Sequence, residues 1–523
     1  MDPNAHATLR LRAFYRLLKR KGGNALASYY RYCNSDDVAT PYDDSNVAVW
    51  EEAGEEARQL VLGNEADNQK LDERITAHEL GPDVPWVLIG GPPCQAYSLV
   101  GRSRNRGKAD YRAEEDKRHF LYLEYLRIIR KYRPKVFVME NVKGILSASV
   151  NGAKIFHTIL KDLSDPDAAL GEEVSGHGYK IYSLSCATSY SGATSANKMD
   201  VHDFVLQAED YGIPQARHRV ILLGVREDIT TVPEPLVRES LATVRHALDG
   251  LPPLRSKLSK QKDSAELWAQ VVREHFIELD RQSRNIPDFK DLRKVLKQRM
   301  TEVRDGWSEG ATRLAQQPVT PSMFPSPLHS WYADVNLKVW LNHQSRSHMS
   351  ADLLRYAYAS SFAEAKLHSP KGHAEFALPG LKPNHANWET GKFADRFRVQ
   401  LYGRPATTVT SHISKDGHYF IHPDPAQCRS LTVREAARIQ TFPDNYFFQG
   451  TRTQQFHQVG NAVPPLLAKQ IGDVVYRLMA AAGLCAMRDD GEGDERTPQV
   501  EMPLREADAD ADVEADAIAE IVA

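Results

Sequence analysis

The sequence contains few cysteines and no long apolar segment. Its 523 residues include five widely spaced cysteines without a C-x-x-C pair, which excludes a disulfide framework and a cysteine zinc cluster and is typical of a reducing cytoplasm. No run of eighteen apolar residues exists, so the sequence predicts no membrane-spanning helix. The N-terminal residues also lack the apolar core and the cleavage site of a signal peptide. We therefore expect a cytoplasmic protein.

The formal net charge of −3 hides an uneven distribution along the chain. Asp489–Ala523 holds 13 acidic and 2 basic residues, which leaves 64 basic and 56 acidic residues elsewhere, a charge of +8. Alanine and aspartate alternate in this segment, so we expect residues 485–523 to form a disordered acidic tail. The basic remainder is compatible with a polyanionic partner such as nucleic acid.

Short apolar runs alternate with a helical pattern in the first half of the chain. Apolar runs predict strands over residues 85–89, 136–139, 180–185 and 220–225, and helical spacing predicts a helix over 120–132. Continuous apolar strands separated by helices indicate an α/β fold with a Rossmann-like, doubly wound and mainly parallel sheet. Functional side chains are then expected at the carboxyl ends of the strands.

The alternating pattern breaks between about Glu234 and Ala386. A charged helical stretch, Ser264–Arg304, is followed there by proline- and aromatic-rich sequence. We therefore predict a catalytic domain over 1–233, a smaller inserted domain over 234–386 and a return to the catalytic domain over 387–484. Within the return, Thr407–Ile421 has strand character, and Thr432–Gln440 is expected to be a helix with a Thr432–Glu435 capping box.

Two segments carry side chains that could react. Cys94 follows a predicted strand in the rigid loop Gly90–Gln95, which favours an exposed nucleophile over the buried, inert cysteine that is otherwise more common. Glu140 ends another buried strand, where a carboxylate is costly unless it is hydrogen-bonded or used. It could therefore be a proton donor or a loop-anchoring acid.

Two further segments carry clustered positive charge. Arg217 and Arg219 precede a strand, and alternation places them on one face, where they need anionic or carbonyl acceptors; a surface ion pair is the plain alternative. The loop Gly101–Lys108 suits phosphate binding, although it could be only a solvated charged loop. Its basic residues are Arg102, Arg104, Arg106 and Lys108.

Taken in order, these segments resemble the sequence blocks of the DNA (cytosine-5) methyltransferase family. The matching motifs are PCQ at 93–95, ENV at 140–142, QARHR at 215–219, RSLTVREAARIQTFPDNY at 429–446 and GNAVP at 460–464. Asp116–Leu121 also resembles the family's D-x-R-x-x-L block. The blocks cover about residues 87–472 and are interrupted only where the family keeps its target-recognition domain. Five blocks with this order and spacing are highly specific.

The resemblance implies a reaction and a set of roles. The Cys94 thiolate would add to cytosine C6, Glu140 would protonate N3, and C5 would take the methyl group of S-adenosylmethionine. Arg217 and Arg219 would hold cytosine O2 and order the site. The base would be flipped out of duplex DNA. Expected DNA contacts are Gln95, Arg102, Arg104, Arg106 and Lys108, and expected cofactor contacts are Leu121, Asn461 and Asn64.

One part of the family pattern is not found in this sequence. The family opens with a strand, an F-x-G-x-G turn and then an acidic residue for the cofactor ribose. Here Met1–Ala5 resembles the segment that directly follows that acidic residue. We therefore expect in-frame DNA upstream of Met1 to encode roughly 30–40 further residues, about one strand–helix–strand unit.

Two other functions are compatible with the motifs. The chain could be a non-catalytic DNA-binding remnant that has lost its cofactor site, or a tRNA cytosine-5 methyltransferase, which also uses a PCQ cysteine. A recognition region of about 150 residues favours duplex DNA, because much of a specific interface must be built from it. A purely structural two-domain protein leaves the co-occurring motifs unexplained. We expect a monomer that acts on duplex DNA, with a cognate restriction endonuclease as a partner in a restriction-modification system.

Overall fold

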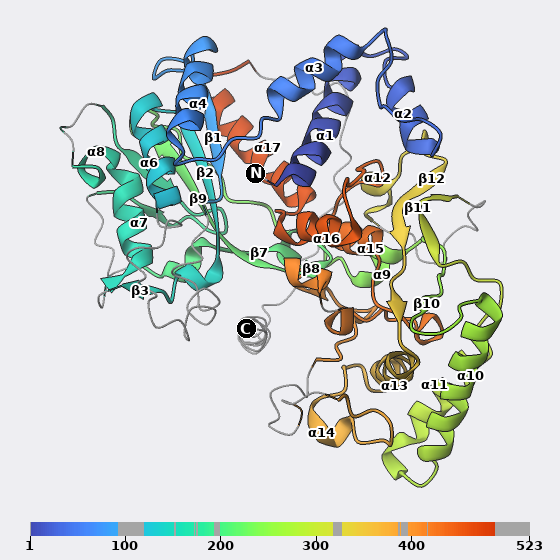
Figure 1. Cartoon of the computed structure of the whole chain (residues 1–523). Helices are drawn as coiled ribbons and strands as arrows, with labels where there is room; N and C mark the ends of the chain where they lie inside the picture. The colour runs from blue at the N-terminus through green and yellow to red at the C-terminus, as the bar shows by residue number, and fades with distance from the viewer. Residues whose placement is uncertain are drawn as a thin grey trace. The chain divides into compact units, whose positions relative to one another are not determined.

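The computed structural model describes residues 2–92, 120–150, 153–171, 173, 176–192, 199–316, 327–384, 388, 396–415 and 417–486. The chain divides into two compact units, each assembled from separate stretches (Figure 1). The first comprises Met1–Gln59, Ala208–Arg217 and Glu239–Leu467; the second comprises Leu60–Gln207, His218–Arg238 and Ala468–Ala523. Within the described ranges, no helix is both long and apolar enough to cross a bilayer.

A six-stranded sheet forms the centre of the second unit. The strand order is β1-β2-β9-β5-β6, with β7 also paired to β9. β1 and β2 are parallel, whereas the β2–β9, β5–β9, β5–β6 and β7–β9 pairs are antiparallel. The strands are β1 (Val87–Gly90), β2 (Val136–Val142), β5 (Tyr179–Tyr182), β6 (Ser189–Tyr190), β7 (Val205–Gln207) and β9 (His218–Arg226).

The sheet is mixed, so the expectation of a mainly parallel sheet is wrong for the described strands. β2 and β5 are both antiparallel to β9, which lies between them, and β1, β2 and β5 therefore share one direction. A parallel neighbour requires a crossover connection, usually an α-helix. Between β5 and β9, the described residues contain only short strands and the 3₁₀ turns η4 (Val201–Phe204) and η5 (Ala208–Tyr211). The α/β class and the strand positions agree with the prediction.

Helices complete the second unit. They are α4 (Glu65–Ala77), α6 (Phe120–Tyr132), α7 (Ile155–Ser164), α8 (Pro166–Ala169) and most of α17 (Pro465–Ala481); the turn η2 (Lys143–Ile145) and the hairpin β3 (Ser149–Val150) and β4 (Ala153–Lys154) follow β2. Phe137 and Met139 of β2 pack with Leu126 and Ile129 of α6 and with Phe156 of α7. The predicted helix over 120–132 is confirmed. Further along the chain, α17 contributes the buried side chains Val474 and Leu478.

The first unit is mainly helical and holds three two-stranded sheets, β11–β12, β10–β13 and β8–β14, among its described residues. Its first half contains α1 (Pro3–Lys21), α2 (Ala27–Asn34), α3 (Val47–Glu56), β8 (Gln215–Ala216), α9 (Val244–Leu248), β10 (Lys257–Leu258), α10 (Ala265–Gln282), η6 (Pro287–Phe289) and α11 (Lys290–Met300). Then follow β11 (Gly310–Ala315), α12 (His329–Tyr332), β12 (Val339–Gln344), β13 (Ser347–His348), α13 (Ser350–Lys366) and α14 (Gly372–Glu375). The last elements are β14 (Ala406–Thr407), η7 (Ser411–Ser414), η8 (Gly417–Tyr419), η9 (Pro425–Gln427), α15 (Val433–Ile439) and α16 (Arg452–Asn461).

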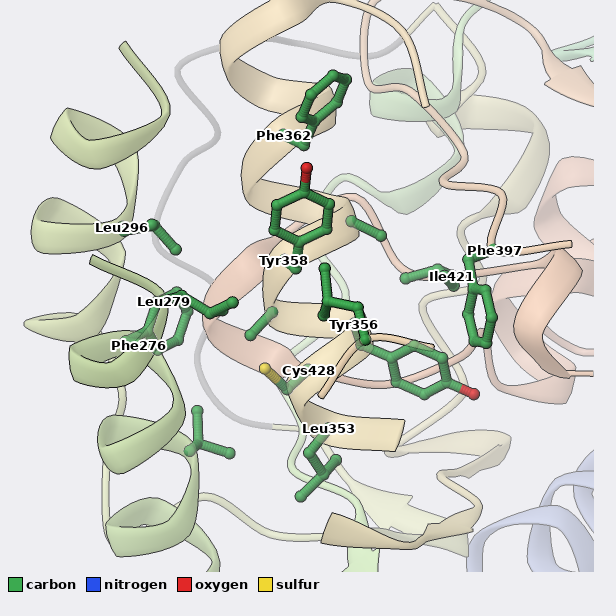
Figure 2. Close-up of a cluster of buried hydrophobic side chains, with 14 of the residues drawn as sticks. Phe276, Leu279, Leu296, Leu353, Tyr356, Tyr358, Phe362, Phe397, Ile421 and Cys428 are labelled. Atoms are coloured by element: carbon green, nitrogen blue, oxygen red, sulfur yellow. The ribbon is translucent and has the colours of Figure 1, made fainter. Parts of the chain in front are cut away.

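An apolar core joins α10, α11 and α13, as Figure 2 shows. Phe276 and Leu279 of α10 and Leu296 of α11 pack with α13, and the charged stretch predicted to be helical is confirmed as α10 and α11. Cys428 is buried in the same core, and burial raises the pKa of its thiol. The first unit continues from Glu239 to Leu467 and includes residues 2–59, and the limits of the inserted domain stay a prediction.

The expected strand character of Thr407–Ile421 is wrong. Among the described residues of this stretch, only β14 and Ile421, which forms isolated bridges to Val399 and Ser430, have strand geometry, and η7 and η8 occupy the middle. Hydroxyl and amide side chains bond to backbone groups instead. For example, Thr408 Oγ1 donates to Ala216 O at 2.6 Å, and Gln400 Oε1 accepts from Thr407 N at 2.9 Å. Such bonds compete with a regular ladder.

A buried polar cluster surrounds the start of α15. The predicted capping box is confirmed, because Glu435 Oε2 accepts from Thr432 N at 2.7 Å and Thr432 Oγ1 accepts from Glu435 N at 3.2 Å. Arg429 donates two hydrogen bonds to the Glu435 carboxylate, at 2.8 and 2.6 Å. His422 and His343 are buried beside this pair. Burial, which disfavours the charged imidazolium, lowers the pKa of each histidine from 6.5 to about 4.

We expect acid to destabilise the protein through His343 and His422. Their folded pKa values lie below the unfolded value of 6.5, so the stability that they contribute is complete above pH 6.5 and is lost as the pH falls towards 4. Between pH 7 and pH 5 each histidine should cost about 2 kcal/mol of unfolding free energy. Urea denaturation at the two pH values measures this cost. A His343→Gln/His422→Gln variant should show a smaller pH dependence than wild type, whereas the exposed-site control His329→Gln should not. An unchanged pH slope in the double variant would contradict the prediction.

Candidate active site

Glu140 and Arg219 form an ion pair on neighbouring strands of the second unit. In the β2–β9 ladder Val142 lies opposite Arg219 and Glu140 lies opposite Ile221. Glu140 Oε1 is 3.1 Å from Arg219 Nε, and the two side chains are 26% and 16% exposed. The pair is thus shielded from bulk water on most sides but remains reachable. It places a carboxylate, which can take up and release a proton, beside a cationic donor.

The chain that leaves β1 passes directly beside this carboxylate. A Cβ placed on Gly91 would lie 3.1 Å from Glu140 Oε2, so any larger residue there would require the carboxylate to shift by a few tenths of an ångström. Asn141 Nδ2 donates to Pro92 O at 3.2 Å, which ties the same segment to β2. Parallel pairing of β1 with β2 brings the two strand ends together. Cys94, Gln95, Arg102, Arg104, Arg106 and Lys108 lie outside the described residues.

Arg217 has different partners from Arg219. It belongs to the first unit, is 3% exposed, and donates from Nη1 to Val409 O at 2.9 Å and from Nη2 to Gly460 O at 3.2 Å. The expectation that these arginines need carbonyl or anionic acceptors therefore holds for both. Arg217 donates to two carbonyls, whereas Arg219 donates to His218 O at 2.7 Å and pairs with the Glu140 carboxylate.

A family model for the C-5 cytosine-specific DNA methylase matches residues 56–168 and 195–477. These ranges make up more than half of the chain and include Cys94, Glu140, Arg217 and Arg219. The chain belongs to the C-5 cytosine-specific DNA methylase family.

This DNA methylase is similar in sequence to several known methyltransferases. It is 32% identical over 495 residues to the type II methyltransferase M.Bpa9945I of Bacillus paralicheniformis, an alignment that covers 90% of this chain and 91% of the relative. It is 28% identical to the type II methyltransferase M.DdeI of Desulfomicrobium norvegicum, covering 74% of this chain and 71% of the relative. The DNA (cytosine-5-)-methyltransferase M.ApeKI of Aeropyrum pernix is 25% identical, covering 76% and 82% respectively.

Membership of this DNA methylase family implies S-adenosylmethionine as the cofactor, and the three predicted contacts differ in how well they fit it. Leu121, in the first turn of α6, is half-buried and fits an apolar contact. Asn461 is the exposed last residue of α16 and fits a polar contact. Asn64, by contrast, is the N-cap of α4, and its Oδ1 accepts from Asp67 N at 3.1 Å. Residues 2–86 contain helices and no strand, so they do not supply the strand-and-glycine turn of the family pattern.

The sequence reasoning did not single out Asn141, Gln215 or Gln440, although each makes a defined contact within its own unit. Asn141 stands inside the ENV motif, so its position beside Glu140 was the available signal. Gln215 opens the QARHR motif, and Gln440 stands in the matched stretch before Thr441. Both are fully buried, and Gln215 Nε2 donates to Gln440 Oε1 at 2.9 Å. No local pattern predicts a contact between residues this far apart in the sequence.

Proposed function

We propose that this chain methylates C5 of cytosine within a specific sequence of duplex DNA. Membership of the DNA methylase family and the type II methyltransferase relatives support methylation of DNA cytosine in general. S-adenosylmethionine, when bound, supplies an electrophilic methyl group, and we propose Leu121 and Asn461 among the residues that contact it. The basic remainder of the chain, with a charge of +8 outside Asp489–Ala523, supports a polyanionic substrate.

The proposed chemistry uses Cys94 as the nucleophile and Glu140 as the general acid. The Cys94 thiolate forms a bond to cytosine C6 while Glu140 gives its proton to N3, so that negative charge does not build up on the ring. C5 thereby becomes an enamine carbon, which would form a bond to the methyl group of S-adenosylmethionine as the bond from that methyl to the cofactor's sulfur breaks and S-adenosylhomocysteine leaves. Loss of the C5 proton to a base then breaks the C6–S bond, and return of the N3 proton regenerates Glu140.

The observation that carries this proposal is the Glu140–Arg219 pair beside Gly91. Cytosine N3 and O2 are adjacent acceptors, and the pair provides an acid for one and a guanidinium donor for the other. Cys94 follows Gly91 by three residues, a stretch that extended chain covers in about 10 to 11 Å. Access to C6 requires that the base leave the duplex stack. We propose that Gln95 and the basic residues of Gly101–Lys108 contact the DNA.

The proposal is tested by identifying the methylated product. Chain, S-adenosylmethionine carrying a labelled methyl group, and either duplex DNA or tRNA are incubated, and the nucleic acid is digested to nucleosides. Labelled 5-methylcytosine from duplex DNA alone is the expected result. Label from tRNA alone would favour a tRNA methyltransferase, and DNA binding without label would favour a non-catalytic remnant.

We further propose that Glu234–Ala386 selects the methylated sequence. This segment lies between the matched motifs, and a base-reading module must vary independently of the chemistry. Exchanging it with the corresponding segment of M.DdeI should transfer the sequence preference of the donor, as measured by bisulfite sequencing of methylated plasmid. The reciprocal chimera is the control. If a folded chimera still methylated the original site, the residues that select the sequence would lie outside Glu234–Ala386.

A further inference from the structure

The C-terminal end of α16 in the first unit is held by two buried side chains. The last carbonyls of a helix have no intrahelical partner and must find one elsewhere. Gln440 Nε2 donates to Val459 O at 2.8 Å, and Arg217 Nη2 donates to Gly460 O at 3.2 Å. A cation at this position also complements the helix dipole. These bonds fix the turn that carries Asn461, whose own side chain is exposed.

Gln215 and Arg217 also form hydrogen bonds with the backbone amide and carbonyl of Val409. Gln215 Oε1 accepts from Val409 N at 2.6 Å, and Arg217 Nη1 donates to Val409 O at 2.9 Å. The segment that follows lies against α16 so closely that a Cβ on Gly460 would fall 2.3 Å from Thr410 C. Because Gln215 also bonds Gln440, all three side chains belong to one buried network. Arg217 is 3% exposed, and two of its nitrogens already donate to carbonyls.

We infer that Arg217, with Gln215 and Gln440, is a positioning residue for Asn461 and does not contact cytosine. The inference rests on the proposed function, because Asn461 is proposed there as a cofactor contact. It divides the QARHR motif into two roles. Gln215 and Arg217 set the Asn461 turn, and Arg219 faces the reacting base through its pair with Glu140. Loss of Arg217 should therefore weaken cofactor binding before it affects the chemistry.

The test compares Arg217→Met with Asn461→Ala and with the double variant. Arg217→Met keeps the apolar stem and removes both hydrogen bonds. Isothermal calorimetry should show about tenfold weaker binding of S-adenosylmethionine, and hydrogen exchange should be faster at the amides of residues 457–462. Asn461→Ala should weaken binding in wild type but by less than threefold in the Arg217→Met background, because residues in one network are not additive. Arg217→Lys, which retains one donor, should recover part of the affinity.

A matched control separates positioning from general loss of stability. Arg434 is fully buried in the same unit, donates to the carbonyls of Leu341, Pro443 and Tyr446 at 2.8, 3.1 and 2.7 Å, and lies 4.0 Å from Asp444 Oδ1. Arg434→Met should lower the unfolding midpoint without changing cofactor affinity. If Arg217→Met does not fold, Gln440→Met removes one donor from the same helix end and should give the same pattern.

The outcomes distinguish this inference from the proposed function. Unchanged cofactor affinity in Arg217→Met, together with a slower single-turnover rate at saturating cofactor, would indicate that Arg217 contacts cytosine. That result would overturn the inference. Additive effects of Arg217→Met and Asn461→Ala, or no cofactor binding by wild type, would also overturn it. The proposed function is tested by a separate measurement: it fails if duplex DNA treated with the wild-type chain and S-adenosylmethionine contains no 5-methylcytosine.

Discussion

Replacement of Cys94 by serine is expected to reduce methyl transfer to duplex DNA below detection. A hydroxyl is a far weaker nucleophile than a thiolate, and the proposed reaction cannot begin without addition to C6. Single-turnover methylation with labelled S-adenosylmethionine measures the loss. DNA affinity and the unfolding midpoint should stay near wild type, because only one atom changes.

Two further measurements make the Cys94 prediction specific. Duplex DNA containing 5-fluorocytosine should form a stable covalent adduct with wild type, because fluorine cannot leave C5 as a proton does, and Cys94→Ser should form none. Cys186 is a free cysteine in the same unit. Partial burial raises the pKa of its thiol, but hydrogen bonds with Thr188 and Ser183 outweigh this and leave the pKa below its usual value, and Cys186→Ser is the matched control. Wild-type turnover by Cys94→Ser would exclude covalent catalysis through this residue.

Substitution of Glu140 by glutamine should slow the single-turnover rate by about 10²–10⁴-fold, the usual contribution of general acid catalysis. Glutamine keeps the size of the side chain and an oxygen for Arg219, but it has no proton to give to N3. The rate is to be measured with DNA and cofactor saturating, so that weaker binding does not contribute.

The control for Glu140 is another ion-paired glutamate of the same unit. Glu124 lies 2.9 Å from Arg127 and is 18% exposed, close to the exposure of Glu140. Glu124→Gln should change the rate by less than threefold. A similarly small change in Glu140→Gln would argue that this acid only anchors Arg219.

The local elements of the second unit could be predicted from sequence, whereas the direction of its strands could not. Apolar runs marked β1, β2 and β9 because a strand buried in a sheet needs little more than continuous apolar side chains. The direction of a strand depends on how the chain returns to the sheet. The long connection between β5 and β9 has no apolar periodicity from which that direction could be predicted. The capping box of α15 was predictable because both of its side chains lie within one helical turn.

The candidate site shows the same division between local and distant contacts. Glu140 beside the segment after β1 follows from two parallel strands ending at one edge, which the motif order already suggested. The partners of Arg217 do not follow, because Val409 and Gly460 are 192 and 243 residues away in the sequence. Alternation grouped Arg217 with Arg219, but a guanidinium is placed by its acceptors, and these come from the other end of the chain.

The interleaved course of the chain has a consequence for synthesis on the ribosome. Each unit is closed by residues near the end of the described chain: α16 contributes to the first, and α17 contributes to the second. The first unit therefore cannot complete its core until Leu467 has left the exit tunnel, and the second cannot do so until α17 has left it. Because translation adds about 5–20 residues per second, the apolar surface of the early segments stays exposed for tens of seconds. A nascent chain of this design depends on chaperones more than one whose domains are contiguous, and premature termination anywhere before α16 leaves both units incomplete.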